Sequence, residues 1–248
     1  MRHYVLTRSA YGPAWDLDAN RRRLEVTRLV TVAGMAAQTN RDWTWLVALD
    51  RSDPIREERK AVFASAGVEV RFLDVASESN KSRAAAEAYR ADWNSLIGPR
   101  DEPVAMTRLD DDDAFAPWVM GRIIEMAPRM RKRSAMMMPY GLRVWDGRCT
   151  IVCHNSNAMQ TLVTPAGDPM HVYSYKHREV SDYAEVHKID RRIAWLWSRH
   201  GDTISGWHTA NHPLSPKLRQ IFPVDWSVFG EPKSTRGKMQ GLQGRYFR

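Results

Sequence analysis

Short β-prone runs alternate with helical segments through the first 110 residues of this chain. We expect strands over 3–7, 43–49, 68–75 and 103–109, and helices over 21–38, 55–66 and 81–96. The run Trp43–Leu49 is almost entirely apolar, which is typical of a strand buried on both faces of a parallel sheet. The β-α-β-α order therefore predicts an α/β fold with a mostly parallel central sheet, right-handed crossovers and flanking helices.

Four consecutive carboxylates, Asp110–Asp113, directly follow the last of these expected strands. Adjacent like charges repel one another, more strongly as the local dielectric falls. Ligands of parallel sheets bind beyond the carboxyl ends of the strands, and Mg²⁺ and Mn²⁺ prefer carboxylate oxygens together with substrate phosphates. The acids therefore predict a metal–phosphate site. A solvated acidic loop or acids at a helix N-terminus is the alternative, although capping needs only one or two acids.

The chain has no G-x-G-x-x-G after its first expected strand and no Walker-type phosphate loop. Both absences argue against a nicotinamide enzyme and a P-loop NTPase. A nucleotide-binding sheet without a glycine-rich loop would hold a diphosphate through a metal and acids.

Three stretches resemble a known family. They are Gln38–Val47 with Asp50, Arg108–Phe115, and the later segment Ile193–Gly201. The chain resembles a GT-A-type glycosyltransferase, and the rhamnosyltransferase-like group is the closer match. The resemblance covers about the first 125 residues well, whereas 129–190 matches weakly. It implies a nucleotide-sugar donor, linked to UDP, GDP, TDP or CDP, and Mn²⁺ or Mg²⁺ as cofactor.

The resemblance implies a role for each acid of the run. Asp110 would face the ribose of the nucleotide or a metal-bound water. Asp112 would be the principal metal ligand, with Asp113 in support. Asp111 belongs to the same nucleotide-binding segment, but it points the opposite way in an extended chain, which favours a structural role.

Further donor-binding residues follow from the same resemblance. Asp50 ends the second strand, where such enzymes recognise the base or the ribose. Arg8, after the first strand, would contact the phosphate or base, with an ordinary surface arginine as the alternative. Arg108 would bind near the nucleotide or neutralise its acidic neighbours. His200 and His208 are the best candidates to complete the metal shell, although a structural role for any single histidine is the alternative.

An inverting transfer needs a carboxylate to take the proton from the acceptor hydroxyl. Asp182, Glu185 and Asp190 are the candidates, on a polar stretch before a tryptophan-rich segment that we expect to be helical. Asp146 is a weaker one, because Asp146-Gly147 favours a hairpin turn. A retaining reaction would not need this base, so the stereochemistry stays open.

The expected organisation is a nucleotide-sugar-binding half over 1–125, a mixed acceptor-side half of the same domain over 126–229, and a flexible basic tail over 230–248. The net charge is +8, with basic clusters at 21–23, 129–133 and in the tail. Such clusters suggest an anionic partner, with solvated helix faces as the alternative. The acceptor is therefore expected to be a glycan or a hydroxylated base in DNA, as in DNA modification.

Two other function classes remain open. One is a nucleotidyltransferase or phosphotransferase that uses the acids for a metal–triphosphate. The other is a non-catalytic nucleic-acid-binding protein, although four adjacent acids would repel phosphate.

Cys149 and Cys153 lack the further cysteines of a zinc or disulfide framework, which predicts reduced, buried thiols. The sequence shows no signal-peptide pattern and no stretch long enough to span a bilayer. We expect a cytoplasmic protein without membrane insertion; its oligomeric state is open.

Overall fold

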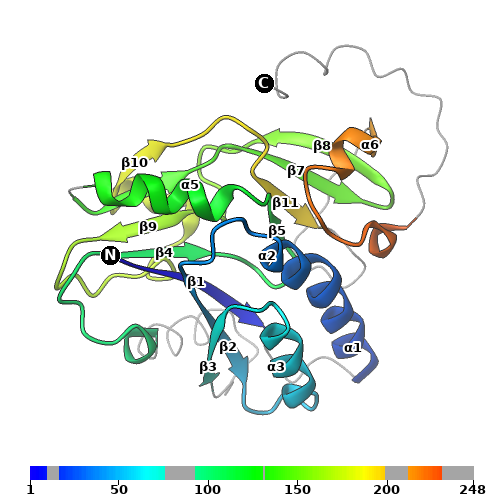
Figure 1. Ribbon diagram of the computed structural model, residues 1–248, viewed down its shortest axis with the longest axis horizontal. Helices are drawn as coiled ribbons and strands as arrows, with labels where there is room; N and C mark the ends of the chain where they lie inside the picture. The colour runs from blue at the N-terminus through cyan, green and yellow to red at the C-terminus, as the bar shows by residue number, and fades with distance from the viewer. Residues whose placement is uncertain (10–16, 76–92, 131, 199–211, 231–248) are drawn as a thin grey trace.

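The computed structural model describes residues 1–9, 17–75, 93–130, 132–198 and 212–230 (Figure 1). Most of the helix expected over 81–96 falls outside these ranges, and residues 93–97 are helical. His200, His208 and the tail after Gly230 also lie outside the described residues.

The first sheet has the strand order β10-β6-β9-β4-β1-β2-β3. Its strands are β1 (Arg2–Ser9), β2 (Thr44–Asp50), β3 (Glu69–Val75), β4 (Val104–Arg108), β6 (Ser134–Met137), β9 (Thr161–Thr164) and β10 (Glu185–Lys188). Strands β4, β1, β2 and β3 pair in parallel, as do β10 and β6, and within this sheet β9 runs against both of its neighbours. The predicted mostly parallel sheet is confirmed.

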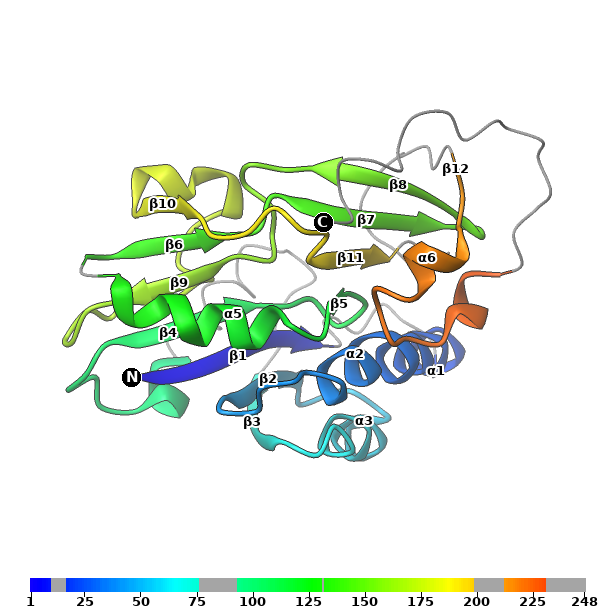
Figure 2. The same ribbon diagram turned by 45° about the horizontal axis from the view of Figure 1, so that its top comes forward.

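Helices cover this sheet and line one side of the molecule. They are α1 (Leu17–Val26), the π-helical turn η1 (Thr27–Val32), α2 (Ala33–Ala36), α3 (Arg56–Ala64), α5 (Val119–Met126) and α6 (Pro216–Arg219). Three 3₁₀ turns add to these: η2 (Ala127–Arg129), η3 (His177–Asp182) and η4 (Trp226–Phe229). Figures 1 and 2 both show α1, α2 and α3 grouped beside β2 and β3, with β7 and β8 on the opposite side.

A second, mixed sheet has the order β12-β8-β7-β11-β5. Its strands are β5 (Ala114–Phe115), β7 (Tyr140–Trp145), β8 (Arg148–Cys153), β11 (Trp195–Ser198) and β12 (His212–Pro213). The helix expected over the tryptophan-rich segment is wrong, because this segment is strand β11, paired with β7 and β5. In a strand, Trp195 and Trp197 project to the same face and Leu196 to the other; Trp195 and Leu196 are buried, whereas Trp197 is partly exposed.

The hairpin between β7 and β8 turns at Asp146 and Gly147, with φ of 49° and 66°. Positive φ at both central residues is the geometry of a two-residue hairpin turn, so the predicted turn is confirmed. On β8, Cys149 is buried and Cys153 is exposed, and both are free thiols. The prediction of buried thiols therefore holds for Cys149 and is wrong for Cys153.

The first sheet is covered on both faces, because successive residues of its strands enter different apolar clusters. Val5 and Trp45 belong to the larger cluster, whereas their neighbours Leu6 and Leu46 belong to the smaller one. Such two-sided burial explains the continuous apolar run of β2. In the described part of the chain, no helix is long and apolar enough to cross a membrane.

The four acids lie where the chain passes from one sheet to the other. They leave β4 of the first sheet and enter β5 of the second within five residues, 109–113. This junction places Asp110–Asp113 between the parallel sheet and the strands contributed by residues after 126. Since β9 pairs with β4, the expected acceptor-side half shares a sheet with the expected nucleotide half.

Candidate active site

Backbone hydrogen bonds hold both ends of the acid run. The N–H of the buried Leu109 donates to the carbonyl of Leu6 at 3.1 Å, which fixes the exit from β4. At the other end, the N–H of Asp113 donates to the carbonyl of Asp110 at 3.2 Å. A carboxylate oxygen of Asp113 also accepts from the N–H of Ser198 at 3.0 Å. The run is therefore a turn tied to β1 and β11.

Gln38 and Gly34 fasten the segment that follows the acids. Gln38 donates to the carbonyls of Gly34 and Ala116 at 3.0 and 3.1 Å, and it accepts from the N–H of Met120 at 3.1 Å. A Cβ on Gly34 would lie 2.9 Å from the Cβ of Ala114, so the helix can approach this closely only with glycine there. Gln38, part of the stretch that carried the family resemblance, thus has a structural role.

Two of the four acids face a buried arginine. Arg23, 5% exposed, forms an ion pair with Asp112 at 3.0 Å, and its Nε donates to Asp111 at 3.2 Å. The Ser9 hydroxyl donates to the other oxygen of Asp111 at 2.6 Å. The repulsion within the run is therefore relieved in part by the protein itself. The structural role expected for Asp111 agrees with these contacts.

A second buried arginine extends this arrangement. The fully buried Arg59 donates to Asp53 at 2.7 Å, to the Asn20 side chain at 3.2 Å and to the Ser9 hydroxyl at 3.4 Å. We call the connected set the arginine network; it consists of Ser9, Asn20, Arg23, Asp53, Arg59, Asp111 and Asp112. It ties α1 and α3 to the ends of β1 and β4.

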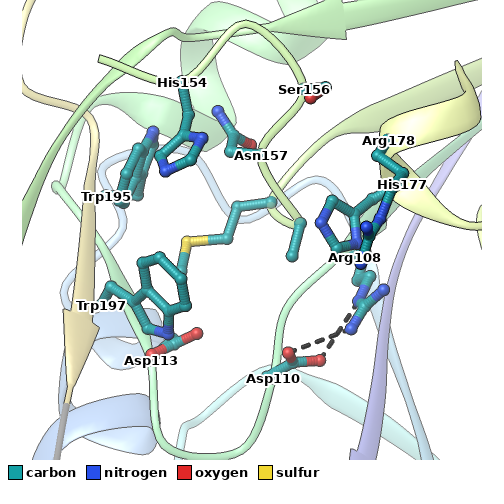
Figure 3. Close-up of a pocket in the computed structure, with 12 residues that line it drawn as sticks. Arg108, Asp110, Asp113, His154, Ser156, Asn157, His177, Arg178, Trp195 and Trp197 are labelled. Atoms are coloured by element: carbon teal, nitrogen blue, oxygen red, sulfur yellow. Dashed lines mark hydrogen bonds and ion pairs between the residues drawn. The ribbon is translucent and has the colours of Figure 1, made fainter. Parts of the chain in front are cut away.

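The other two acids face a cavity of about 390 Å³ (Figure 3). Arg108, Asp110 and Asp113 form one part of its wall. The remainder comes from residues 154 and 156–159 between β8 and β9, residues 177 and 178 of η3, and Trp195 and Trp197 of β11. Each lining residue lies at or after the end of β4 in the sequence.

The pKa values of the two acids of the cavity are shifted in opposite directions. Burial acts to raise the pKa of Asp110, but the positive charges of Arg108, Arg8 and Arg23 outweigh it and lower the pKa. Arg108 also donates to Asp110 at 3.2 and 3.1 Å. Burial, followed by the negative charges of Asp112 and Asp110, raises the pKa of Asp113 well above its ordinary value. Asp110 therefore loses its proton more readily than Asp113.

Arg8 lies beside this site. Its guanidinium lies 4.5 Å from the centre of the Tyr173 ring, and that of Arg108 lies 5.0 Å from the same ring. Burial raises the pKa of Tyr173 to about 12, so its hydroxyl keeps its proton. Both arginines contribute positive charge at the end of β1 and β4, where we predicted phosphate binding.

Asp50 does not line the cavity. It is 3% exposed, and one of its oxygens accepts from the N–H and hydroxyl of Ser52 at 2.9 and 2.8 Å. It lies at the carboxyl edge of the sheet as predicted, but its carboxylate closes a local turn.

The structure does not bring the three predicted bases to the cavity. Asp182 and Glu185 are exposed, and Glu185 begins β10, which runs parallel to β6 at the edge of the sheet. Glu185 is therefore at the amino edge, whereas the acids follow the carboxyl end of β4. Asp190 accepts from the Arg192 guanidinium at 3.0 and 2.8 Å. This geometry does not support any of the three as the catalytic base.

Sequence reasoning missed His154, Asn157 and His177, which all line the cavity. They fall in the region that matched the family weakly, and no local motif marks them. Burial, then the charge of Arg108, lowers the pKa of His177 to about 4, so its imidazole is neutral near pH 7. Trp195, of the tryptophan-rich segment, also lines the cavity, and Gly141 opposite makes room for it, because a Cβ there would lie 2.0 Å from the Trp195 ring.

No group of three or more His, Cys, Asp or Glu side chains in the described ranges is arranged to hold a metal ion. The two carboxylates of the cavity instead fit a cation that takes one or two protein ligands and completes its shell with phosphate and water, as Mg²⁺ does. Asp112, predicted as the principal ligand, is turned toward Arg23. His200 and His208 cannot be placed because they lie outside the described residues.

Comparison with known families decides the class of the protein. Residues 15–212 match the family model described as "Putative rhamnosyl transferase". The chain belongs to this family. It is therefore a glycosyltransferase, and its α/β architecture with a mostly parallel sheet is the one predicted from the sequence. Family membership sets aside the nucleotidyltransferase and the non-catalytic nucleic-acid-binding alternatives.

Solved structures show only distant likeness. Mouse xyloside xylosyltransferase 1 is 11% identical with a TM-score of 0.44, over 76% of this chain and 85% of that one. A putative nucleotide-diphospho-sugar transferase from Desulfovibrio desulfuricans is 10% identical with a TM-score of 0.41, over 80% and 82%. S. aureus TarS is 11% identical with a TM-score of 0.35; 59% of this chain spans 21% of that one. No curated protein matches the chain.

Proposed function

We propose that this glycosyltransferase moves a sugar from a nucleotide-diphosphate sugar to an acceptor hydroxyl, and that the transfer takes place beside Asp110. The observation that carries the proposal is the position of the acids. They lie at the carboxyl edge of a parallel sheet, where ligands of such sheets bind, and two of them, Asp110 and Asp113, line a cavity.

The donor nucleotide would bind on the sheet side of Asp110. Arg8 and Arg108 supply positive charge for the diphosphate at the ends of β1 and β4. Both guanidinium groups pack on Tyr173, which restricts their movement and presents their N–H donors in a fixed direction. These residues would bind and orient the leaving group.

A divalent cation, Mn²⁺ or Mg²⁺, is part of the proposal. Asp110 and Asp113, the two carboxylates that line the cavity, would be its protein ligands. When bound, such a cation neutralises charge on the departing diphosphate. Asp112 would keep its ion pair with Arg23 and hold the turn in shape.

The reaction can proceed with inversion or retention. An inverting reaction needs a proton acceptor at the cavity, and the lining groups of suitable chemistry are Asp110, Asp113, His154 and His177. Proton NMR of the anomeric configuration of the first product distinguishes the two outcomes.

A thermal-shift screen tests the proposed function. The probes are UDP-, GDP-, TDP- and CDP-sugars, each with and without Mn²⁺. A donor at 100 times its Kd stabilises the fold by about 2.7 kcal/mol, which is roughly 5–10 °C for a chain of this size. We expect a Mn²⁺-dependent shift with one donor.

The shift should disappear in Asp110→Asn and persist in Asp101→Asn, an exposed acid at a distance from the acid run. Absence of a shift with every donor, with and without Mn²⁺, would refute the proposed function.

A further inference from the structure

The cavity combines an aromatic wall with polar groups. Trp195 and Trp197 lie along one wall, and Figure 3 shows both indoles on the same side, next to Asp113. The His154 ring meets Trp197 edge-on, with centroids 6.1 Å apart, and the Arg143 guanidinium lies 5.1 Å from the Trp197 ring. These contacts hold the Trp197 indole in place. A rigid aromatic side chain packs against the apolar face of a flat ligand at little entropic cost.

Asn157 supplies a fixed hydrogen-bond acceptor in the same cavity. Its residue is 6% exposed, and its Nδ2 donates to the carbonyl of Met138 at 3.0 Å. This bond sets the direction of the amide, so Oδ1 is the remaining acceptor. Within the described structure, Oδ1 is buried and has no hydrogen-bond partner. A buried unsatisfied acceptor costs about 1–3 kcal/mol, which a ligand hydroxyl would recover by donating to it.

We propose that this cavity binds a sugar ring of the acceptor, so that the acceptor is a carbohydrate. The inference rests on the proposed function, because it takes the acids as the site of transfer. A sugar ring offers an apolar face to Trp197 and hydroxyl donors to Asn157 and Asp110. The volume of about 390 Å³ is within the range of small-ligand pockets.

The ion pairs of the basic clusters favour a carbohydrate over a DNA base. A DNA acceptor would need unpaired cations along the path of its phosphates. Arg23 instead lies inside the arginine network. In the second cluster, Arg129 pairs with Glu125 at 3.2 Å and Arg133 with Asp168 at 2.7 Å. Three arginines of these clusters, Arg23, Arg129 and Arg133, thus already have acidic partners within the protein.

The test measures direct binding of two kinds of acceptor probe to the full chain. The first is a set of methyl glycosides of rhamnose, glucose, galactose and N-acetylglucosamine, observed by saturation-transfer NMR with Mg²⁺ and nucleoside diphosphate present. The second is a DNA duplex that contains 5-hydroxymethylcytosine, observed by fluorescence anisotropy. Trp197→Leu removes the aromatic face, Trp197→Phe keeps one, and His154→Ala changes an exposed cavity residue with little risk to folding. Trp145→Leu, at a tryptophan that is 44% exposed on the β7–β8 hairpin, is the matched control.

We expect at least one glycoside to bind, with affinity at least tenfold lower in Trp197→Leu, partly restored in Trp197→Phe and unchanged in Trp145→Leu. His154→Ala should weaken the same glycoside by two- to fivefold. The donor-induced thermal shift should survive in Trp197→Leu, which separates the acceptor subsite from the donor site.

Three results would overturn the inference and leave the proposed function intact, provided that the donor shift is present. The first is that no glycoside binds. The second is that glycoside binding does not change in Trp197→Leu. The third is that the duplex binds with an affinity that falls in Trp197→Leu but not in Trp145→Leu. Loss of the donor shift in the unmodified protein would instead refute the proposed function.

Discussion

The two sides of the acid run differ in what their carboxylates face. On one side, Asp111 and Asp112 meet Arg23 in the arginine network, where buried charges have partners of opposite sign. On the other, Asp110 and Asp113 border a cavity that also holds the unpartnered Oδ1 of Asn157. Neighbouring residues of one short turn thus serve different purposes. We call the first the closed side, because it holds the turn in place, and the second the open side, because it is open to a ligand.

This difference changes the interpretation of a row of acids. Four carboxylates in sequence suggest a shared task, because each adds the same charge. In the folded chain, Arg23, which is 88 residues away from Asp111 in sequence, binds Asp111 and Asp112. Asp110 and Asp113 border the cavity instead. The closed side would be sensitive to any change in charge, since a buried ion left without its partner is costly. The open side should tolerate isosteric changes in folding but not in activity.

Arg23→Met breaks the closed side and has the largest expected effect. It leaves Asp111 and Asp112 buried without their cation, which destabilises the fold by about 3–5 kcal/mol. Urea denaturation measures this loss. Arg21→Met, at an exposed position of the same helix, should change the free energy of unfolding by less than about 0.5 kcal/mol. Equal effects of the two substitutions would contradict the network.

Asp110→Asn breaks the open side. We expect turnover with the donor to fall at least about 100-fold, equivalent to about 2.7 kcal/mol of transition-state stabilisation. Its free energy of unfolding should change by about 1 kcal/mol or less, because Asp110 is the least buried of the four acids. Asp146→Asn, at the hairpin turn where asparagine also tolerates positive φ, is the control that should keep full turnover. Normal turnover of Asp110→Asn would remove Asp110 from the site.

Gly34→Ala tests whether the turn of the acid run, Asp110–Asp113, needs the close approach of helix α2. The new methyl group would overlap Ala114, directly after Asp113, and we expect a loss of about 1–3 kcal/mol. Gly121→Ala is the matched helical control, because its Cβ would meet Asn40 at an ordinary 3.6 Å. That control should be neutral or stabilising by up to about 1 kcal/mol. Thermal denaturation of the two variants gives the comparison.

The smallest effect concerns the pH dependence of stability on the open side. In the unfolded chain His177 takes a proton near pH 6.5, whereas in the folded chain its pKa is lowered to about 4. The unfolded state therefore binds more protons between these values, and stability is lost as pH falls from 6.5 toward 4. His177→Gln should remove part of that loss, less than about 1 kcal/mol since the ring is partly exposed. Identical pH profiles for both proteins would contradict the burial of this ring.

The parallel sheet could be predicted because local signals encode it. The apolar run of β2 and the Gly67 that follows α3 both depend on neighbouring residues alone, and Gly67 indeed has φ of 69°. The helix predicted for the tryptophan-rich segment was wrong, because this segment is strand β11, whose partners β7 and β5 are distant in sequence. Its strand state is a tertiary effect that a short apolar pattern cannot distinguish from a helix.

The candidate site could be predicted only in part, for the same reason. The position of the acids follows from the strand that precedes them, so their place at the sheet edge was predictable. Their division was not, because it depends on Arg23 of α1 and on cavity residues such as Trp197 of β11, which are distant from the acids in sequence. Asn157 and His177 carry no local motif at all, and they join the cavity only once β9 has paired with β4.

The most direct test of this division is the affinity of Mn²⁺ for the nucleotide-bound protein, measured by electron paramagnetic resonance. The account predicts that Asp110→Asn weakens Mn²⁺ binding at least tenfold. It also predicts that Asp112→Asn lowers the free energy of unfolding while its folded fraction keeps the original affinity. The opposite pattern, with Mn²⁺ affinity lost in Asp112→Asn and kept in Asp110→Asn, would contradict the assignment of Asp112 to the closed side.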